Sequence, residues 1–381
     1  MKKIYLDNAA TTPIDKIVLE AMKPYFSEKY GNTMSLHSFG QEAKLAVEKS
    51  RAILASMINA KPNEIIFTSS ATESNNAALK GVVFNKKSGH IVISSIEHPC
   101  VIESAKWLEK QGFEITKLPV DKFGMVNPND VKKSIKENTI LVSVMHASNE
   151  IGTIQPIEEI GKICRNAGVY FHTDASQSFG KELIDVNKMN IDLLTASSHK
   201  IYGPKGVGLL YIRNGIKIEP LLHGGGQENG MRGSTINVAG IVGFAKAAEI
   251  CKKEMKKENK RLITLRSKLI KEVLKIKNSR LNGHPAKRLA NNANLSFDFI
   301  EGESLLMQLD MEGIACSTGS ACSSFKLEPS HVLLALGLKP EQAHGSLRVS
   351  LGRWTTKKDI ERIIKVLPKI IKKIRAISPF K

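Results

Sequence analysis

Short apolar runs rich in β-branched residues alternate with helical patterns through the first two-thirds of the chain, and this alternation limits the fold most strongly. Seven segments have the length and composition of buried strands: Glu64–Thr68, His90–Ser94, Phe113–Leu118, Thr139–Met145, Val169–Thr173, Leu193–Ala196 and Gly208–Tyr211. Segments with helical spacing of apolar residues lie between them: Ala71–Phe84, Val101–Lys110 and Ile157–Asn166. Strands separated by helices predict an α/β fold around a mainly parallel sheet.

A second, smaller domain is expected from the rest of the chain. From about Val238 to Lys277, one long amphipathic pattern predicts one or two helices that leave the sheet domain. We predict a large domain over residues 15–250, and a small α+β domain over residues 1–14 and 251–381.

Cysteine usage and the N-terminus indicate where the chain works. The five cysteines are an odd number and widely scattered, which makes a poor disulfide framework and fits a reducing compartment. The first residues lack the apolar core of a signal peptide, and no apolar run reaches the length of a membrane span. We therefore expect a soluble, cytoplasmic protein.

The formal net charge of +19 fits three readings: nucleic-acid binding, acidic partner proteins, or a solvated lysine-rich surface. The lysines cluster in Lys252–Lys260 and Lys357–Lys373, and both stretches belong to patterns typical of core-facing helices with a wet outer face. Aromatic residues are not interleaved with these lysines, so no platform for stacking bases is indicated. We expect neither membrane binding nor direct nucleic-acid binding.

Polar residues follow several predicted strands, at the edge where ligands bind in open α/β sheets. The segment Ser69–Ser74 has the small residues and hydroxyls of a phosphate cradle at a helix start, although a plain N-cap by Ser70 or Thr72 is the simpler interpretation of it alone. Asp174 follows another strand. A carboxylate there can pair with a protonated pyridine nitrogen or cap a helix.

Two lysines follow the strand Leu193–Ala196. Lys200 comes soon after it, whereas Lys205 lies between Pro204 and Gly206 in a tight turn. A lysine at a strand end is well placed to form a Schiff base with an aldehyde cofactor, so we favour Lys200; a surface lysine is the alternative for both.

Two further strand ends carry polar residues. His98 follows His90–Ser94, and its imidazole suits stacking on a flat ring or proton transfer near neutral pH. Asn149 follows Thr139–Met145, and its amide suits a ring hydroxyl. Each residue taken alone is more often a cap or a satisfied core group.

Two cysteines lie in a small, polar, glycine-containing stretch that predicts a mobile loop over about residues 316–328. An exposed thiol in such a loop can act as a nucleophile. Cys316 and Cys322 lie six positions apart, wider than a CxxC pair, and no second pair completes a zinc site. Arg348, in an alternating stretch typical of a strand, is the kind of planar donor that binds a carboxylate.

Taken together, these motifs resemble the cysteine desulfurases of iron–sulfur cluster assembly, which are pyridoxal 5'-phosphate enzymes of the aminotransferase-like fold (fold type I). The resemblance runs through nearly the whole chain: YLDNAATTP, SSATESNN, EHPC, HASNEIG, DASQS, SSHKIYGPKG, HGGGQENGMRGST, EGES, STGSACSS, LEPSHVL and SLRVSLGR. The combination of SSHKIYGPKG with STGSAC is the most specific part. The chain departs from the pattern at Cys100 and Cys316, neither of which replaces a motif residue.

The resemblance implies how the cofactor is held. Lys200 forms the Schiff base and, once freed, moves the substrate's Cα proton with His98 as a partner. His98 stacks on the cofactor ring, and Asp174 pairs with the pyridine nitrogen. Gln177 and Asn149 contact the ring oxygen or the substrate. The phosphate is bound by residues from two strand ends and by one residue of the neighbouring subunit: Ala71, Thr72, Ser197, His199 and Thr235.

The resemblance also implies the reaction. Arg348 binds the carboxylate of L-cysteine, and Cys322 takes the sulfur, giving L-alanine and a Cys322 persulfide. The enzyme is an obligate homodimer, because Thr235 completes the neighbouring site. Cys322 hands its sulfur to an iron–sulfur scaffold protein, and delivery of sulfur for tRNA thiolation stays open. Cys322 is also a candidate ligand of a cluster shared with that scaffold. Two roles stay open for Cys316: a disulfide with Cys322, or a second persulfide site.

Two other classes compete with this interpretation. An aminotransferase acting on small amino acids uses Lys200, Asp174 and Arg348 but has no use for a thiol on a mobile loop. A basic binding protein that has lost catalysis has no use for Lys200, Asp174 or Cys322.

Overall fold

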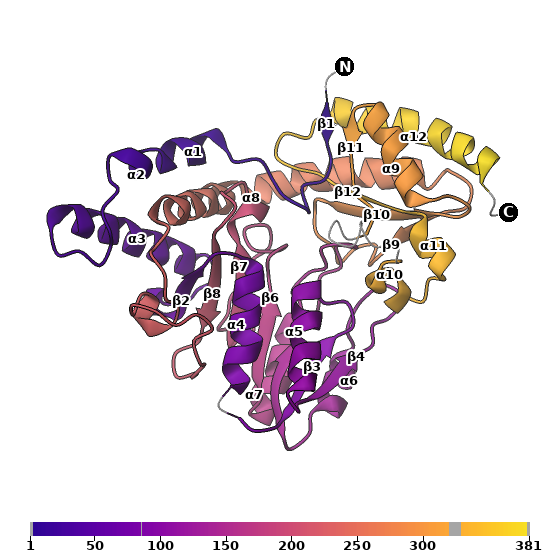
Figure 1. Ribbon diagram of the computed structural model, residues 1–381. Coiled ribbons are helices and arrows are strands. Elements are labelled where there is room, and N and C mark those ends of the chain that lie inside the picture. Colours follow the sequence, from indigo (N-terminus) through magenta and orange to yellow (C-terminus); the bar gives the residue numbers. More distant parts are fainter. Residues whose placement is uncertain (1–2, 85, 320–328, 379–381) are drawn as a thin grey trace.

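The computed structural model describes residues 3–84, 86–319 and 329–378 (Figure 1). A seven-stranded sheet with the order β2-β8-β7-β6-β5-β3-β4 forms its largest part. The strands are β2 (Ile65–Thr68), β3 (His90–Ser94), β4 (Glu114–Leu118), β5 (Thr139–Ser143), β6 (Tyr170–Asp174), β7 (Leu193–Ser197) and β8 (Gly208–Ile212). Only β8 is antiparallel to its neighbours among these strands, so the predicted mainly parallel sheet is confirmed.

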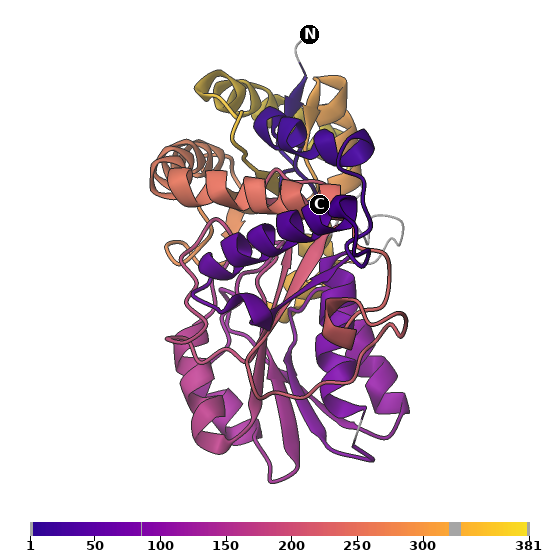
Figure 2. The ribbon, with the colours of Figure 1, turned by 90° about the vertical axis from the view of Figure 1, so that its left-hand side faces the viewer.

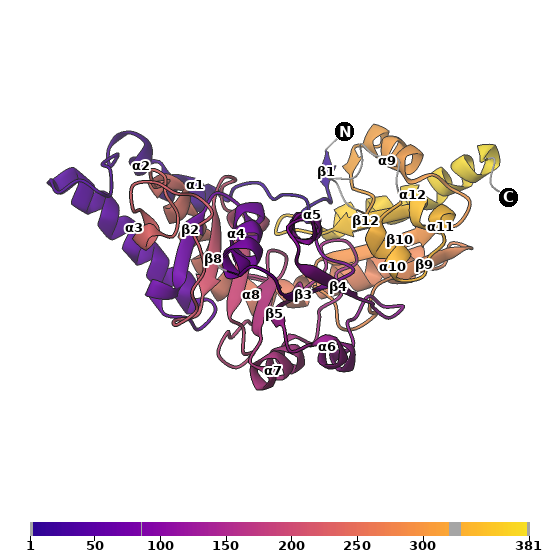
Figure 3. The same ribbon diagram turned by 60° about the horizontal axis from the view of Figure 1, so that its bottom comes forward.

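Helices cover both faces of this sheet (Figures 2 and 3). α4 (Ala71–Val83) and α5 (Pro99–Lys110) pack on one face; α6 (Pro128–Ser134) and α7 (Ile157–Ala167) lie on the other. Successive strand residues point into opposite cores: in β2, Ile65 and Phe67 join the core with α7, while Ile66 joins the core with α4 and α5. This two-sided burial explains why the strands are almost continuously apolar.

Three further helices lie beside one end of the sheet: α1 (Lys16–Met22), α2 (Pro24–Ser27) and α3 (Ser38–Ser56). Both α1 and α3 pack on α8 (Val238–Val273). Short 3-10 turns complete this part at η1 (Pro62–Glu64), η2 (Ser198–Lys200) and η3 (Glu228–Gly230).

Two small sheets build the rest of the described chain. β9 (Ser279–Asn282), β10 (Asn292–Phe297) and β12 (Ser346–Ser350) form an antiparallel sheet, and β1 (Ile4–Tyr5) pairs in parallel with β11 (Ile314–Ala315). The accompanying helices are α9 (Gly302–Met311), α10 (His331–Ala335), α11 (Pro340–His344) and α12 (Lys357–Ile377). The N-terminus thus lies among C-terminal elements (Figure 1).

The helix α8 joins the two parts. Phe244, near its start, belongs to a core of the large sheet, and Leu269, near its end, belongs to the separate core of the small sheets. The predicted boundary between residues 250 and 251 falls inside this helix. We keep the division into residues 15–250, and 1–14 with 251–381, as a proposal that the two separate cores support. Within the described residues, no helix is both long enough and apolar enough to span a bilayer.

Candidate active site

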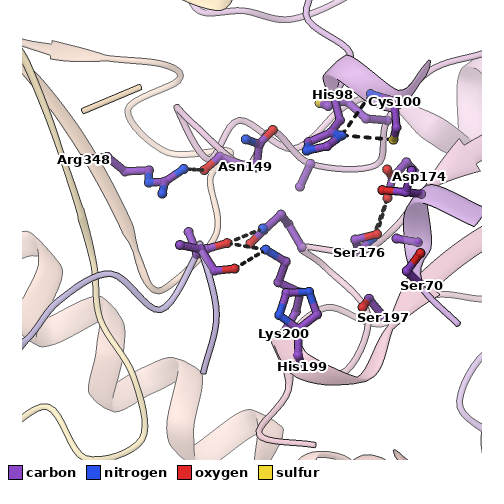
Figure 4. Close-up of a pocket in the computed structure, with 17 residues that line it drawn as sticks. Ser70, His98, Cys100, Asn149, Asp174, Ser176, Ser197, His199, Lys200 and Arg348 are labelled. Atoms are coloured by element: carbon purple, nitrogen blue, oxygen red, sulfur yellow. Dashed lines mark hydrogen bonds between the residues drawn. The ribbon is translucent and has the colours of Figure 1, made fainter. Parts of the chain in front are cut away.

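A cavity of about 260 Å³ lies where the parallel strands of the large sheet end. Residues that follow β2, β3, β5, β6 and β7 line it, together with Ala9 and Ala10 of the N-terminal segment and one residue of the small antiparallel sheet. It brings together ten of the residues predicted from the sequence: Ala71, Thr72, His98, Asn149, Asp174, Gln177, Ser197, His199, Lys200 and Arg348 (Figure 4).

Lys200 enters the cavity from the 3-10 turn η2, directly after β7. Its Nζ donates hydrogen bonds to the carbonyl oxygens of Ala9 and Ala10, both at 2.7 Å. The rival Lys205 lies on an exposed turn and does not line the cavity. The N-terminal segment therefore fixes the amine that the sequence favours.

Asp174 is the last residue of β6 and is nearly buried. Its Oδ1 accepts hydrogen bonds from the backbone N–H and the hydroxyl of Ser176, at 2.9 and 2.5 Å. Its Oδ2 accepts one from the side-chain amide of Asn75 at 2.7 Å. These donors hold the carboxylate in one orientation at the cavity wall, where it can accept from a cationic N–H.

His98 forms the N-cap of α5, where Nδ1 accepts from the backbone N–H of Cys100 at 3.2 Å. Burial lowers the pKa of His98; Asp174 opposes that shift, while Lys200 and His331 add to it. The imidazole is therefore neutral at physiological pH.

The start of α4 forms the opposite wall of the cavity. Ser70 caps the helix, its Oγ accepting from the backbone N–H of Glu73 at 3.2 Å, and Ala71 and Thr72 supply the first-turn N–H groups at the positive end of the helix dipole. His199 lies nearby, and burial lowers its pKa to about 4, with Lys200 and other lysines adding to the shift. An anion at this end would satisfy the helix N–H groups and offset the crowded positive charges.

Arg348 reaches the cavity from β12 and is only 2% exposed. Its Nη2 donates to Asp7 Oδ1 at 2.9 Å and its Nη1 to the Asn149 carbonyl at 3.2 Å. Its Nε is buried and makes no hydrogen bond to any described residue. The guanidinium thus keeps donors for a carboxylate.

A family model described as aminotransferase class-V matches residues 4–363 of the chain. The chain belongs to the class-V aminotransferase family. A curated member from Methanosarcina thermophila, named "Cysteine desulfurase IscS", is 54% identical over 380 residues, which cover 99% of this chain and 94% of that protein.

Solved structures agree with this family. One named "NIFS-LIKE PROTEIN" has a TM-score of 0.92 and 40% identity, covering 97% of this chain and 100% of its own. Another, "SspA in complex with cysteine", has a TM-score of 0.81 and 37% identity, covering 93% and 100%. The predicted family, fold type, enzyme class and cofactor are confirmed: the chain is a pyridoxal-phosphate-dependent cysteine desulfurase.

The cavity fits the cofactor of this class-V enzyme. It holds a lysine amine for an aldehyde, a carboxylate for a pyridine nitrogen, and a helix start for a phosphate: Lys200, Asp174 and the α4 N-terminus respectively. The turn before α4 is tightly packed, because a Cβ on Gly208 would come within 2.6 Å of the Ser70 carbonyl carbon.

Among the predicted residues that the structure describes, one lies outside this cavity. Thr235 is exposed on the segment before α8 and does not line the cavity of its own chain. Cys322 lies outside the described residues. The candidate iron–sulfur ligand is that same residue, and the described part of the chain contains no cluster of His, Cys, Asp and Glu arranged for a metal ion.

The described residues on either side of the Cys322 segment lie beside the cavity. Ser317 forms a β-bridge with Arg348, and Ser330 donates from its hydroxyl to Glu150 Oε2 at 2.5 Å. Cys316 follows β11 directly and is partly buried, and burial, aided by the charge of Asp7, raises the pKa of its thiol.

Sequence reasoning missed the residues that support this class-V site. Asn75 orients Asp174 but comes from the first predicted helix, where it lies one turn after Ala71 and therefore on the same face. Helical spacing from the predicted phosphate cradle would have found it. Asp7 pairs with Arg348 across the whole length of the chain, and no local pattern signals that pair.

Proposed function

We propose that this cysteine desulfurase removes sulfur from L-cysteine with the cavity at the strand ends and leaves it on Cys322. The observation that carries the proposal is the meeting of Lys200, Asp174 and Arg348 in one cavity, beside both flanks of the Cys322 segment. Pyridoxal phosphate, when bound, supplies an aldehyde that takes up amino groups and a ring that accepts electrons from the substrate carbon.

Three groups of residues would hold the cofactor. Lys200 would attach it through Nζ, and Asp174, fixed by Asn75 and Ser176, would hold the pyridine nitrogen protonated. Asn149 and Gln177 would contact the ring oxygen or the substrate. The phosphate would lie against the start of α4 and the end of β7: Ala71, Thr72, Ser197 and His199.

Arg348 would bind and orient the substrate carboxylate. It lies nearly buried, its position is fixed by Asp7 and the Asn149 carbonyl, and it retains unused donors. A substrate oriented in this way would present its Cα proton to Lys200, whose Nζ would take that proton as a base and return it to the substrate carbon.

Cys322 would act as the nucleophile on the substrate's sulfur. The Cys322 thiolate would form an S–S bond with the substrate's sulfur while the substrate's Cβ–S bond breaks. Cβ would then gain a proton, and the product would leave as L-alanine. Two thiols thus become one persulfide and one C–H bond, so no external oxidant or reductant is needed. The persulfide would pass its sulfur to an iron–sulfur scaffold protein or another acceptor. As a further role, Cys322 would be a ligand of an iron–sulfur cluster shared with the scaffold.

We further propose a homodimer. Thr235 is exposed and does not line the cavity of its own chain, as expected of a residue that serves a neighbouring site. A set of apolar side chains, all at least a third exposed, lies on and beside α1, α2 and α3: Ile14, Ile17, Leu19, Phe26, Tyr30, Met34, Leu36, Phe39 and Leu45. Exposed apolar surface of this extent is typical of an interface between subunits.

The cytoplasm is the proposed site of action. Cys100, Cys164, Cys251 and Cys316 are all free thiols in the described part of the chain, as in a reducing compartment.

Two measurements on the purified protein test the function. We expect visible absorption from the bound cofactor that changes on addition of L-cysteine, and release of alanine and sulfur in equal amounts when a thiol reductant is present. L-Serine, which has no sulfur, is the matched control substrate. Release of pyruvate or of a transaminated keto acid in place of alanine would contradict the proposal.

A further inference from the structure

A second cysteine, Cys100, lines the same cavity as Lys200 and has no part in the proposed reaction. Its Sγ lies 3.0 Å from Nδ1 of His98, and its backbone N–H donates to the same nitrogen at 3.2 Å (Figure 4). Asn75 donates its side-chain amide to Cys100 Sγ at 3.1 Å and to Asp174 Oδ2 at 2.7 Å. A chain of hydrogen bonds therefore joins His98 to Asp174 through Cys100 and Asn75.

The donors and acceptors in this chain follow by elimination. Both oxygens of the Asp174 carboxylate accept hydrogen bonds, so Asn75 presents its NH2 group to Oδ2, and the second amide proton points to Cys100 Sγ. The backbone N–H of Cys100 can only donate, so His98 Nδ1 carries a lone pair on that side and no proton. The Cys100 thiol is then the donor to Nδ1.

We propose that Cys100 is a positioning residue whose S–H, donated to His98 Nδ1, keeps the ring proton of neutral His98 on Nε2. Among the described residues, both hydrogen bonds of this ring are made at Nδ1. Figure 4 shows Cys100 on the side of His98 that faces away from Lys200 and Arg348, so Nε2 is the nitrogen on the side of those two residues. The inference rests on the proposed function and sharpens it: His98 is a donor toward the cavity, and Lys200 alone is the base for the Cα proton.

Cys100 also lacks the thiolate that a second sulfur acceptor would need. Burial, with the charge of Asp174 acting in the same direction, raises the pKa of the Cys100 thiol to about 12, although hydrogen bonds from Asn75 and Thr72 oppose the shift. The thiol therefore stays protonated at neutral pH. A protonated thiol is what a donor requires and what a nucleophile lacks.

The position of the ring proton is measured directly by long-range ¹H–¹⁵N correlation of ¹⁵N-histidine-labelled enzyme, with and without bound cofactor. The His98 signals are assigned from a His98→Gln variant. Wild type is expected to carry the proton on Nε2. A proton on Nδ1 in wild type overturns the proposal without reference to any Cys100 variant, while the spectrum and alanine release still report on the proposed function separately.

Variants of Cys100 then distinguish the effect of the thiol's hydrogen bond from the effect of its packing. Cys100→Ala removes the donor, so neutral His98 loses a hydrogen bond and the pKa of His98 should rise by roughly 0.5 to 1 unit. The other titratable groups that act on His98 are unchanged in this variant: Asp174, Lys200 and His331. We expect kcat for alanine formation to fall roughly three- to tenfold with KM little changed. Cys100→Ser keeps an O–H donor and should restore most of both values.

Cys164→Ala is the matched control, because Cys164 is a buried free cysteine of α7 that does not line the cavity. It should leave the His98 tautomer and pKa unchanged. An unchanged His98 pKa in Cys100→Ala, or a persulfide found on Cys100 after turnover, would overturn the positioning role.

Discussion

At the scale of single residues, the site depends on groups held by partners that lie far away in the sequence. Lys200 is fixed by carbonyls of Ala9 and Ala10, and Arg348 by Asp7. Fixed partners reduce the reorganisation that each group needs before it acts, which is how an enzyme makes electrostatic and proton-transfer contributions large.

Lys200, and not Lys205, should attach the cofactor, because only Lys200 lines the cavity. Lys200→Ala is expected to abolish the visible absorption that follows loading with pyridoxal phosphate, since no covalent link to the protein can form. Lys205→Ala is the matched control and should load normally. Loss of the absorption in Lys205→Ala, with a normal spectrum in Lys200→Ala, would reverse the assignment.

Asp174 should matter for rate more than for folding. Asp174→Asn keeps most hydrogen-bonding capacity but removes the negative charge, so alanine formation should slow by roughly a hundredfold or more while the protein still binds cofactor. Steady-state assays with equal cofactor occupancy measure the effect. Turnover close to wild type in this variant would rule out the charge on Asp174 as the feature that activates the ring.

Among helices and strands, the sequence predicts the bounds well where neighbouring residues along the chain determine them. β3 matches the predicted strand from His90 to Ser94, and α4 begins at Ala71 as predicted. The segment predicted to Met145 ends as a strand at Ser143, because the Met145 N–H donates to the buried Glu97 carboxylate at 2.7 Å and not to a neighbouring strand. Periodicity alone cannot show where a strand stops pairing and begins to build a site.

The start of α4 gives a prediction at this scale. Ser70→Ala removes the N-cap of α4, which should cost about 1 kcal/mol of stability and weaken the affinity for pyridoxal phosphate roughly three- to tenfold, because the helix start no longer holds its N–H groups in place. Cofactor titration of the apo enzyme and thermal unfolding measure the two effects.

Thr356→Ala is the control for Ser70→Ala. Thr356 caps α12, which supplies no residue to the cavity, so its loss should lower the melting temperature without changing cofactor affinity. Equal cofactor affinity in the Ser70 and Thr356 variants would mean that α4 does not bind the phosphate.

At the scale of the whole molecule, the site joins parts of the chain that sequence reasoning can identify but cannot place together. The strand ends of one parallel sheet were expected to meet, because parallel strands share an edge. The contribution of β12 through Arg348, and of the N-terminal segment through Ala9, depends on how the small sheets pack, which no local pattern encodes. The lysine-rich helices α8 and α12 do bury their apolar sides, as their spacing predicts, and keep the lysines outside.

The proposed homodimer gives a prediction at the same scale. Leu36, on the segment between α2 and α3, is 92% exposed, so Leu36→Asp should weaken an interface formed by α1 to α3 without disturbing the core. Light scattering is expected to show a dimer for wild type and an increased share of monomer, with lower activity, for the variant. Met307, exposed on α9 away from these helices, gives the control Met307→Asp, which should remain dimeric. A fully active, cofactor-loaded monomer of the wild type would contradict a shared site.

Transfer of the substrate's sulfur to Cys322 is tested by peptide mass spectrometry after a single turnover with L-cysteine. Cys316 is tied to β11 and its thiol is held protonated by burial and by Asp7, so it is a poor nucleophile. We predict a mass increase of one sulfur on the Cys322 peptide, near-normal activity in Cys316→Ser, and cofactor and substrate binding without alanine release in Cys322→Ser. A sulfur adduct on Cys316 with none on Cys322 would show that Cys322 is not the sulfur acceptor.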